Sequence, residues 1–170
     1  MQLSLKSPSR FKGFTLVEAM IALVVLTTFM LACFAAITFS RVTSTKARDE
    51  AVVMDFLVHY AETVKALPFY QVVPGNAVNQ LFDGSGNSPD IRIPADNSWV
   101  ALDTEDFETF HPGLLFLHNR NPKMQVTLVT TSVGGAPHTK ELKIKVDWDA
   151  PLNRGGRLEG QLDVVRVKDL

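Results

Sequence analysis

The chain has 170 residues, a formal net charge of −1, 46% hydrophobic residues and a single cysteine. One cysteine cannot form an intramolecular disulfide, so a disulfide-stapled secreted scaffold and a four-cysteine zinc site are both excluded. Charges of the two signs are interspersed and nearly cancel, which indicates that no nucleic acid is bound through its phosphates. The length suits one compact domain of ordinary size.

The first forty residues depart from this average composition. Residues 1–13 contain no acidic side chain and carry Lys6, Arg10 and Lys12, so their removal would take the formal net charge from −1 to −4. Of the 26 residues from Phe14 to Phe39, 21 are apolar. A helix of that length is about 39 Å long and can cross a hydrocarbon core of about 30 Å with some tilt. The basic leader is expected to stay in the cytoplasm, which places the rest of the chain across the membrane.

A secretory signal peptide, a lipoprotein signal and an uncleaved signal anchor are the alternatives for this segment. A signal peptide has an apolar region of about 7–15 residues and a small-x-small cleavage site, whereas this run is longer and no convincing Ala-x-Ala sequence closes it. A lipoprotein would use Cys33, but the residue types before it fit poorly and the apolar run continues past it. We therefore interpret Cys33 as a small buried apolar residue. The uncleaved anchor stays open.

Glu18 is the only charged residue within the apolar segment. A carboxylate there costs on the order of 2.5–3.5 kcal/mol on insertion, and no Lys or Arg lies between Phe14 and Ser40 to pair with it. Cleavage after Gly13 would create a new α-amino group on Phe14. At about 4 Å and an effective dielectric constant near 20, that pair is worth roughly 4 kcal/mol, which is comparable to the cost. If the amine comes from a neighbouring copy, Glu18 sets the register between packed helices.

The run Lys12-Gly13-Phe14-Thr15-Leu16-Val17-Glu18, followed by an apolar helix, resembles the prepilin leader of type IV pilins and type II secretion pseudopilins. The resemblance is close over residues 11–40 and architectural beyond them. It implies that prepilin peptidase cuts between Gly13 and Phe14 and methylates the Phe14 amine. It also implies that Glu18, then the fifth mature residue, acts in helix registration and assembly with other pilin or pseudopilin subunits. Extraction from the inner membrane by a pilus or secretion motor follows from the same resemblance.

The segment from Arg41 to Leu67 continues the helix in amphipathic form. Asp55, His59 and Glu62 fall on one side, and apolar residues recur at helical spacing on the other. This apolar stripe consists of Val53, Leu57, Tyr60, Val64 and Leu67. Pro68 ends the pattern. The sequence therefore predicts one helix from about Phe14 to Leu67, about 80 Å long, whose second half packs against a small domain.

Residues 69–112 are rich in Pro, Gly, Asn and Asp, and predict loops with one short strand. The run Asp83–Asn87 places oxygen ligands at alternate positions, and some major pseudopilins bind calcium. However, Ser88 and Pro94 stand where an EF-hand has its glycine and glutamate. We interpret the run as a flexible turn and leave metal binding open. A following acidic run is interpreted as a solvated loop or the start of a short helix, with a docking patch for a neighbouring subunit as the alternative; it comprises Asp103, Glu105, Asp106 and Glu108.

After His111 the hydrophobic period becomes two, which predicts strands. The first strand alternates at Met124, Val126 and Leu128, and the second at Leu142, Ile144, Val146 and Trp148. The third, Arg157–Val167, keeps this alternation until Val165 and Val167 change face, which predicts a bulge or an edge strand. Turn residues lie at 134–137 and 153–156. The result is an antiparallel meander with one face on the helix, and its terminal strand after Trp148 resembles the carboxyl end of minor pilins and minor pseudopilins.

No enzymatic site is predicted. His59, His111, His118 and His138 show no helical i, i+4 pairing and no HExxH or acidic metal box. Each is interpreted as a surface or boundary residue. No nucleophile elbow, phosphate-binding glycine loop or plausible cysteine nucleophile is present. We expect no catalytic residue, no metal ligand and no cofactor.

These observations predict an α+β, pilin-like fold in which a long N-terminal α-helix, membrane-spanning in its first half, packs on a small C-terminal antiparallel β-sheet. The expected divisions are a leader at 1–13, a transmembrane and assembly segment at 14–40, an amphipathic segment at 41–67 and a globular domain at 68–170. The expected function is that of a non-catalytic structural subunit, and a minor one, because many major type IV pilins close a carboxyl-terminal disulfide loop and a chain with one cysteine cannot. The expected partners are prepilin peptidase, other subunits and the inner membrane, with the globular domain in the periplasm. The alternative is a signal-anchored periplasmic binding module that retains residues 1–13.

Overall fold

The computed structural model describes residues 15–76, 91–95, 98–151 and 156–168. The chain divides into two compact units, Met1–Arg41 and Val42–Leu170. One long helix, α1 (Leu16–Ala66), has residues in both. Three elements of the head, as we call residues 42–170, are short: the 3₁₀-helix η1 (Phe69–Gln71), the strand β1 (Trp99–Ala101) and the helix α2 (Glu105–Phe110). The remaining elements are the 3₁₀-helix η2 (Pro112–Arg120) and the strands β2 (Lys123–Val133), β3 (Ala136–Asp149) and β4 (Arg157–Val167).

The predicted long helix is confirmed, and it ends one residue earlier than expected, at Ala66. Pro68 follows in an extended conformation with ψ of 145°, so it cannot continue the helix. All five residues of the predicted apolar stripe are buried, while Asp55, His59 and Glu62 are exposed. Helical periodicity therefore identified the face of α1 that enters the core of the head.

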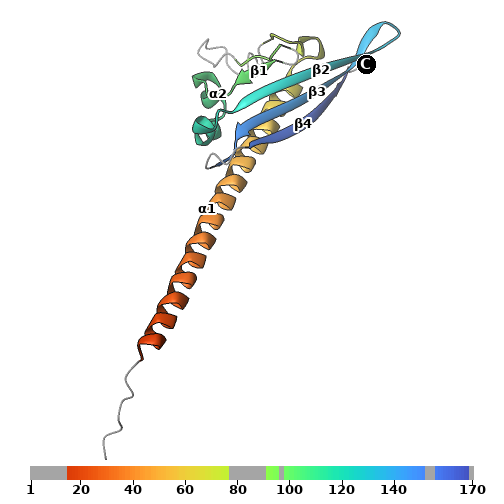
Figure 1. Cartoon of the computed structure of the whole chain (residues 1–170). Helices are drawn as coiled ribbons and strands as arrows, with labels where there is room; N and C mark the ends of the chain where they lie inside the picture. The colour runs from red at the N-terminus through yellow and green to blue at the C-terminus, as the bar shows by residue number, and fades with distance from the viewer. Residues whose placement is uncertain (1–14, 77–90, 96–97, 152–155, 169–170) are drawn as a thin grey trace, which may run out of the picture. The chain divides into compact units, whose positions relative to one another are not determined.

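The sheet has the order β1-β2-β3-β4 with every neighbouring pair antiparallel, so the predicted meander is confirmed. Figure 1 shows the second half of α1 lying against one face of this sheet. The inward side chains of β3 alternate as predicted, and Leu142, Ile144, Val146 and Trp148 are all at most 1% exposed. Together with α1 residues such as Phe56, Leu57 and Tyr60, they form one continuous hydrophobic core.

Two details of the strand prediction were wrong. The period of two begins at Lys123 and not after His111, because residues 112–120 form η2. Its buried Leu114 and Leu117 are spaced three apart, as a 3₁₀-helix requires. The turn between β2 and β3 contains only Gly134 and Gly135, both at positive φ, so the two residues after them already belong to β3.

The last strand was predicted to carry a bulge or to be an edge strand, and the edge strand is confirmed, because β4 is at the end of the sheet order. The register between β3 and β4 runs without a shift from Asp149↔Arg157 to Thr139↔Val167, so β4 has no bulge against β3. Val165 and Val167 are simply the outward residues of an edge strand and are more than half exposed. The irregularity lies instead between β2 and β3, next to Pro137, at Thr131/Ser132. The predicted turn at 153–156 and the run Asp83–Asn87 lie largely or wholly outside the described residues.

Candidate assembly and processing site

The predicted cleavage residues Gly13 and Phe14 lie outside the described residues, and the structure begins next to them at Thr15. The Thr15 hydroxyl accepts a hydrogen bond from the backbone N–H of Glu18 at 3.3 Å, and its carbonyl accepts one from Ala19 at 3.0 Å. This is the first half of a capping box, in which a threonine precedes a glutamate by three residues. Glu18 therefore lies in the first turn of α1, where the helix dipole favours a negative charge.

This capping role was missed at the sequence level, although its signal, Thr15-x-x-Glu18, was present. The hydrogen bond caps the helix through the Thr15 hydroxyl and the backbone of Glu18, and it leaves the Glu18 carboxylate in the first turn, where the helix dipole favours it. Glu18 also lines a shallow surface groove with Ile21, Ala22, Val25, Leu26 and Phe29. Apart from Glu18, the walls of this groove are apolar, so a helix packed there would meet one carboxylate in hydrocarbon surroundings.

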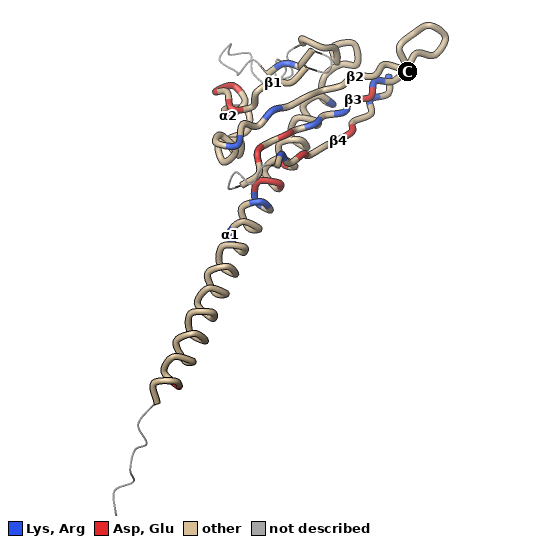
Figure 2. Tube along the Cα trace, in the orientation of Figure 1, with Lys and Arg blue, Asp and Glu red and all other residues tan. Residues whose placement is uncertain are grey.

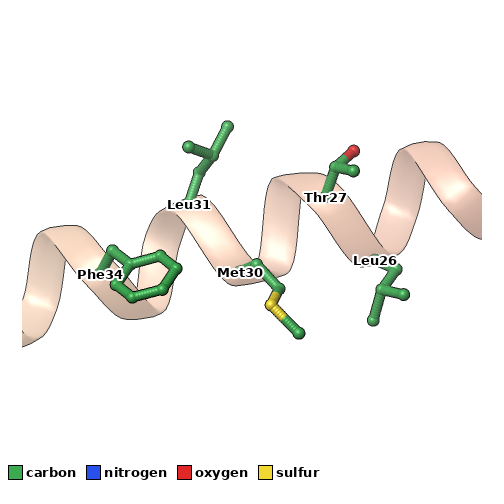
Figure 3. A pocket seen from close by; sticks show the side chains of 5 residues that line it. All are labelled: Leu26, Thr27, Met30, Leu31 and Phe34. Atoms are coloured by element: carbon green, nitrogen blue, oxygen red, sulfur yellow. The ribbon is translucent and has the colours of Figure 1, made fainter.

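The apolar side chains of α1 before Ser40 are bare. The large hydrophobic residues between Leu16 and Phe39 are 51–79% exposed. Together they form a larger contiguous apolar surface than soluble monomers usually expose. Figure 3 shows one stretch of this surface, where Leu26, Met30 and Phe34 project from the same side of the helix at intervals of four residues. By length and composition this helix can cross a membrane. The same surface could equally be covered by other helices.

Polar groups in this stretch are satisfied within the helix. The hydroxyls of Thr27, Thr28 and Thr38 each donate to a backbone carbonyl three or four residues earlier. Such internal bonds let threonine lie in lipid, where no water can replace them. Cys33 is a free, exposed thiol on the same surface, so its expected burial would require a lipid or protein covering. Figure 2 shows the long uncharged stretch of the tube in α1.

Among the described residues of the head, two charged side chains are buried that the sequence patterns did not reveal. Asp49 of α1 is fully buried, with Arg48 Nη2 at 3.2 Å from Oδ1 and Arg120 Nε at 3.6 Å from Oδ2. Lys140 of β3 is 5% exposed, and its ammonium donates to the Phe69 and Val72 carbonyls at 2.8 and 2.7 Å. Burial lowers the pKa of Lys140 from its ordinary value. Asp49 connects α1 to η2 through Arg120, and Lys140 connects β3 to the segment that follows α1 through Phe69 and Val72.

The histidines lie in different surroundings. His111 Nε2 is 3.1 Å from Asp55 Oδ2 and its ring lies 5.9 Å from that of His59, a proximity that sequence spacing did not predict. His118 Nδ1 is 2.7 Å from Glu108 Oε1, and His138 is exposed. Among the described residues, no group of three or more His, Cys, Asp and Glu side chains is placed to hold a metal ion.

Comparison with known proteins gives one match. Residues 8–34 match the family model of the prokaryotic N-terminal methylation motif. Neither the curated proteins nor the solved structures contain a match to the chain. The matched residues include the predicted cleavage residues Gly13 and Phe14, the Thr15–Glu18 turn and most of the apolar part of α1. The small antiparallel sheet lies in the head. The motif indicates a type IV pilin-like precursor, and the long N-terminal helix followed by a small antiparallel sheet is a pilin-like architecture.

Proposed function

We propose that the chain is a non-catalytic structural subunit, and a minor one, of a type IV pilus or type II secretion pseudopilus. Prepilin peptidase cuts between Gly13 and Phe14 and methylates the new amine, and the subunit then leaves the inner membrane through its helix. The observation that carries the proposal is the methylation motif at the amino-terminal end of α1, where the apolar side chains of the helix are exposed and no other part of the described chain covers them. A subunit of this kind needs lipid before assembly and neighbouring helices after it.

The physical driving force for assembly is the exchange of lipid contacts for helix contacts, with Glu18 selecting the register. Among the described residues, no cationic side chain forms an ion pair with Glu18. The apolar face of the amphipathic half of α1 is buried in the core of the head, so it is not available for packing against another subunit. The α-amino group of a processed Phe14 in a neighbouring subunit would supply the missing charge. That pair, worth roughly 4 kcal/mol at about 4 Å, offsets the insertion cost of the carboxylate.

On this proposal, residues 1–13 are the leader, residues 14–40 are the transmembrane and assembly segment, residues 41–67 are the helix of the head, and residues 68–170 complete a periplasmic globular domain. The minor role is proposed because the single cysteine cannot close the carboxyl-terminal disulfide loop of many major pilins. The competing proposal is a signal-anchored periplasmic module, which would keep its leader and would need no assembly.

The experiment compares two substitutions at Glu18 in the native host. Glu18→Gln removes the charge but keeps a side chain that can complete the capping box, whereas Glu18→Ala removes both. We expect both variants to insert in the membrane at wild-type levels and to be depleted from the sheared filament fraction, measured by quantitative immunoblotting. Equal incorporation of Glu18→Gln and wild type would contradict the charge pairing.

A further inference from the structure

A pocket of about 320 Å³ lies beyond the carboxyl end of α1, lined by Phe69, Tyr70, Pro137, Lys140 and Lys168. Its walls combine two aromatic rings and a proline ring with two lysine side chains. Lys168 follows β4 and is held in place because its backbone N–H donates to the His138 carbonyl at 2.8 Å. The pocket is therefore built from η1, the start of β3 and the end of β4, all within the head.

The two lysines have no carboxylate partner in the described part of the chain. The Lys140 ammonium lies 4.8 Å from the centre of the Phe69 ring and uses two of its three N–H groups on the Phe69 and Val72 carbonyls. Burial lowers the pKa of Lys140, as expected for an ammonium removed from water with no anion beside it. A bound carboxylate would supply the missing opposite charge to Lys140 and Lys168 together.

The rest of the pocket suits an apolar neighbour of that carboxylate. Tyr70 is 73% exposed, although it is a large aromatic residue next to the buried core. Tyrosine is enriched at protein interfaces, because its side chain buries a large area at low entropic cost. Pro137 adds a second rigid apolar wall.

We propose that this pocket binds an acidic segment of a neighbouring subunit, with a carboxylate between Lys140 and Lys168 and an apolar side chain against Tyr70. A described segment with exposed carboxylates is α2, where Glu105 and Asp106 are exposed and Phe110 is partly exposed, whereas Phe107 is 6% exposed and belongs to the core of its own head. The inference deepens the proposed assembly and rests on it for the identity of the partner as a subunit. It concerns head-to-head contact and is separate from the helix contact at Glu18.

The α2 segment of the same chain cannot fill the pocket. The Leu102 N–H bonds to the Pro122 carbonyl and Lys123 pairs with Asp147, which places the start of α2 at that end of the sheet. Lys140 lies seven residues along β3 from Asp147, about 24 Å away. Figure 1 shows α2 and the β2–β3 hairpin at opposite ends of the sheet. A contact that joins two different patches on separate molecules is heterologous and can propagate along a filament.

The test uses the purified full chain in detergent micelles and two labelled peptides, read by fluorescence anisotropy. The first has the sequence of residues 103–110, and the second replaces its Asp and Glu residues with Asn and Gln. We expect the acidic peptide to bind in a salt-sensitive manner and the neutral peptide to bind at least tenfold more weakly. Lys168→Gln should weaken the acidic peptide about tenfold and Tyr70→Ala several-fold.

Lys123→Gln is the matched control, because this lysine lies at the far end of β2 and outside the pocket. It should leave the affinity unchanged. No binding of the acidic peptide, equal binding of both peptides, or an unchanged affinity in Lys168→Gln would overturn the inference. Because no filament is present in this assay, its failure would leave the Glu18 experiment as an independent test of assembly.

Discussion

Gly160 of β4 lies so close to Val53 of α1 that a Cβ atom on the glycine would be 2.9 Å from Val53 Cγ1. The same atom would lie 3.4 Å from Leu57 Cδ1 and 3.7 Å from Trp148 Cζ3. The sheet and the helix therefore approach closely where β4 has no side chain. This approach lets the edge strand cover the amphipathic half of α1, and it explains why a glycine stands within a strand that otherwise alternates.

Substitution of Gly160 by alanine is expected to destabilise the head by about 1–3 kcal/mol, because the added methyl group must push two core side chains apart. Urea unfolding of the full chain in micelles, followed by the fluorescence of the buried Trp148, measures this loss. Gly156→Ala is the control, since a Cβ atom there meets nothing within 4 Å. Equal stability of the two variants would contradict the close packing.

The buried carboxylate of Asp49 depends on Arg120, which comes from η2 and is itself 24% exposed. Arg120→Met should destabilise the head by about 1–3 kcal/mol, less than the loss of a fully buried pair, because the half-exposed Arg48 remains beside Asp49. The double variant Asp49→Leu with Arg120→Met should be more stable than Arg120→Met alone. A purely additive double-mutant cycle would show that the two groups are not coupled.

The buried charged residues Asp49 and Lys140 mark the limit of what sequence patterns could predict. Asp49 continues the apolar stripe of α1 one step before Val53, and Lys140 continues the inward alternation of β3 one step before Leu142. Both occupy core positions by spacing, but their charge assigns them to the surface in any hydropathy pattern. Apart from Arg48 beside Asp49, their partners are about 70 residues away, at Arg120 and at the carbonyls of Phe69 and Val72. Only the tertiary fold brings them together.

The periodic parts of the chain were predicted well for the opposite reason. The faces of α1 and of β3 follow from local spacing, because residues four and two apart share a face in a helix and a strand. Residues 112–120 were misassigned, since a 3₁₀-helix has a period of three and is too short to show it clearly. At the candidate site, the assembly role of Glu18 is a prediction from its charge and from the prepilin resemblance, and the structure adds a local contact, the hydrogen bond from its backbone N–H to the Thr15 hydroxyl.

The lowered pKa of Lys140 predicts a pH dependence of stability. Between that lowered value and the ordinary value of 10.5, the unfolded chain binds more protons at this residue than the folded chain does. The free energy of unfolding should therefore gain a positive contribution from Lys140 as pH rises through that interval. Lys140→Met removes this contribution, so the difference in stability between wild type and variant should change with pH below 10.5.

Chemical denaturation at a series of alkaline pH values measures that difference. Lys143→Met is the matched control, because this neighbouring lysine lies on the outer face of β3 with its side chain 45% exposed. Its difference from wild type should change little with pH. Parallel pH profiles for wild type and Lys140→Met would contradict the assignment of the effect to the buried ammonium.

The amino terminus of the protein isolated from native membranes tests the central claim most directly, by intact and amino-terminal mass spectrometry. The account predicts a chain that begins with N-methylated Phe14, and an uncut chain when Gly13 is replaced by a bulky residue. A wild-type chain that begins at Met1 would contradict prepilin processing, remove the amine proposed to pair with Glu18 and favour the anchored module.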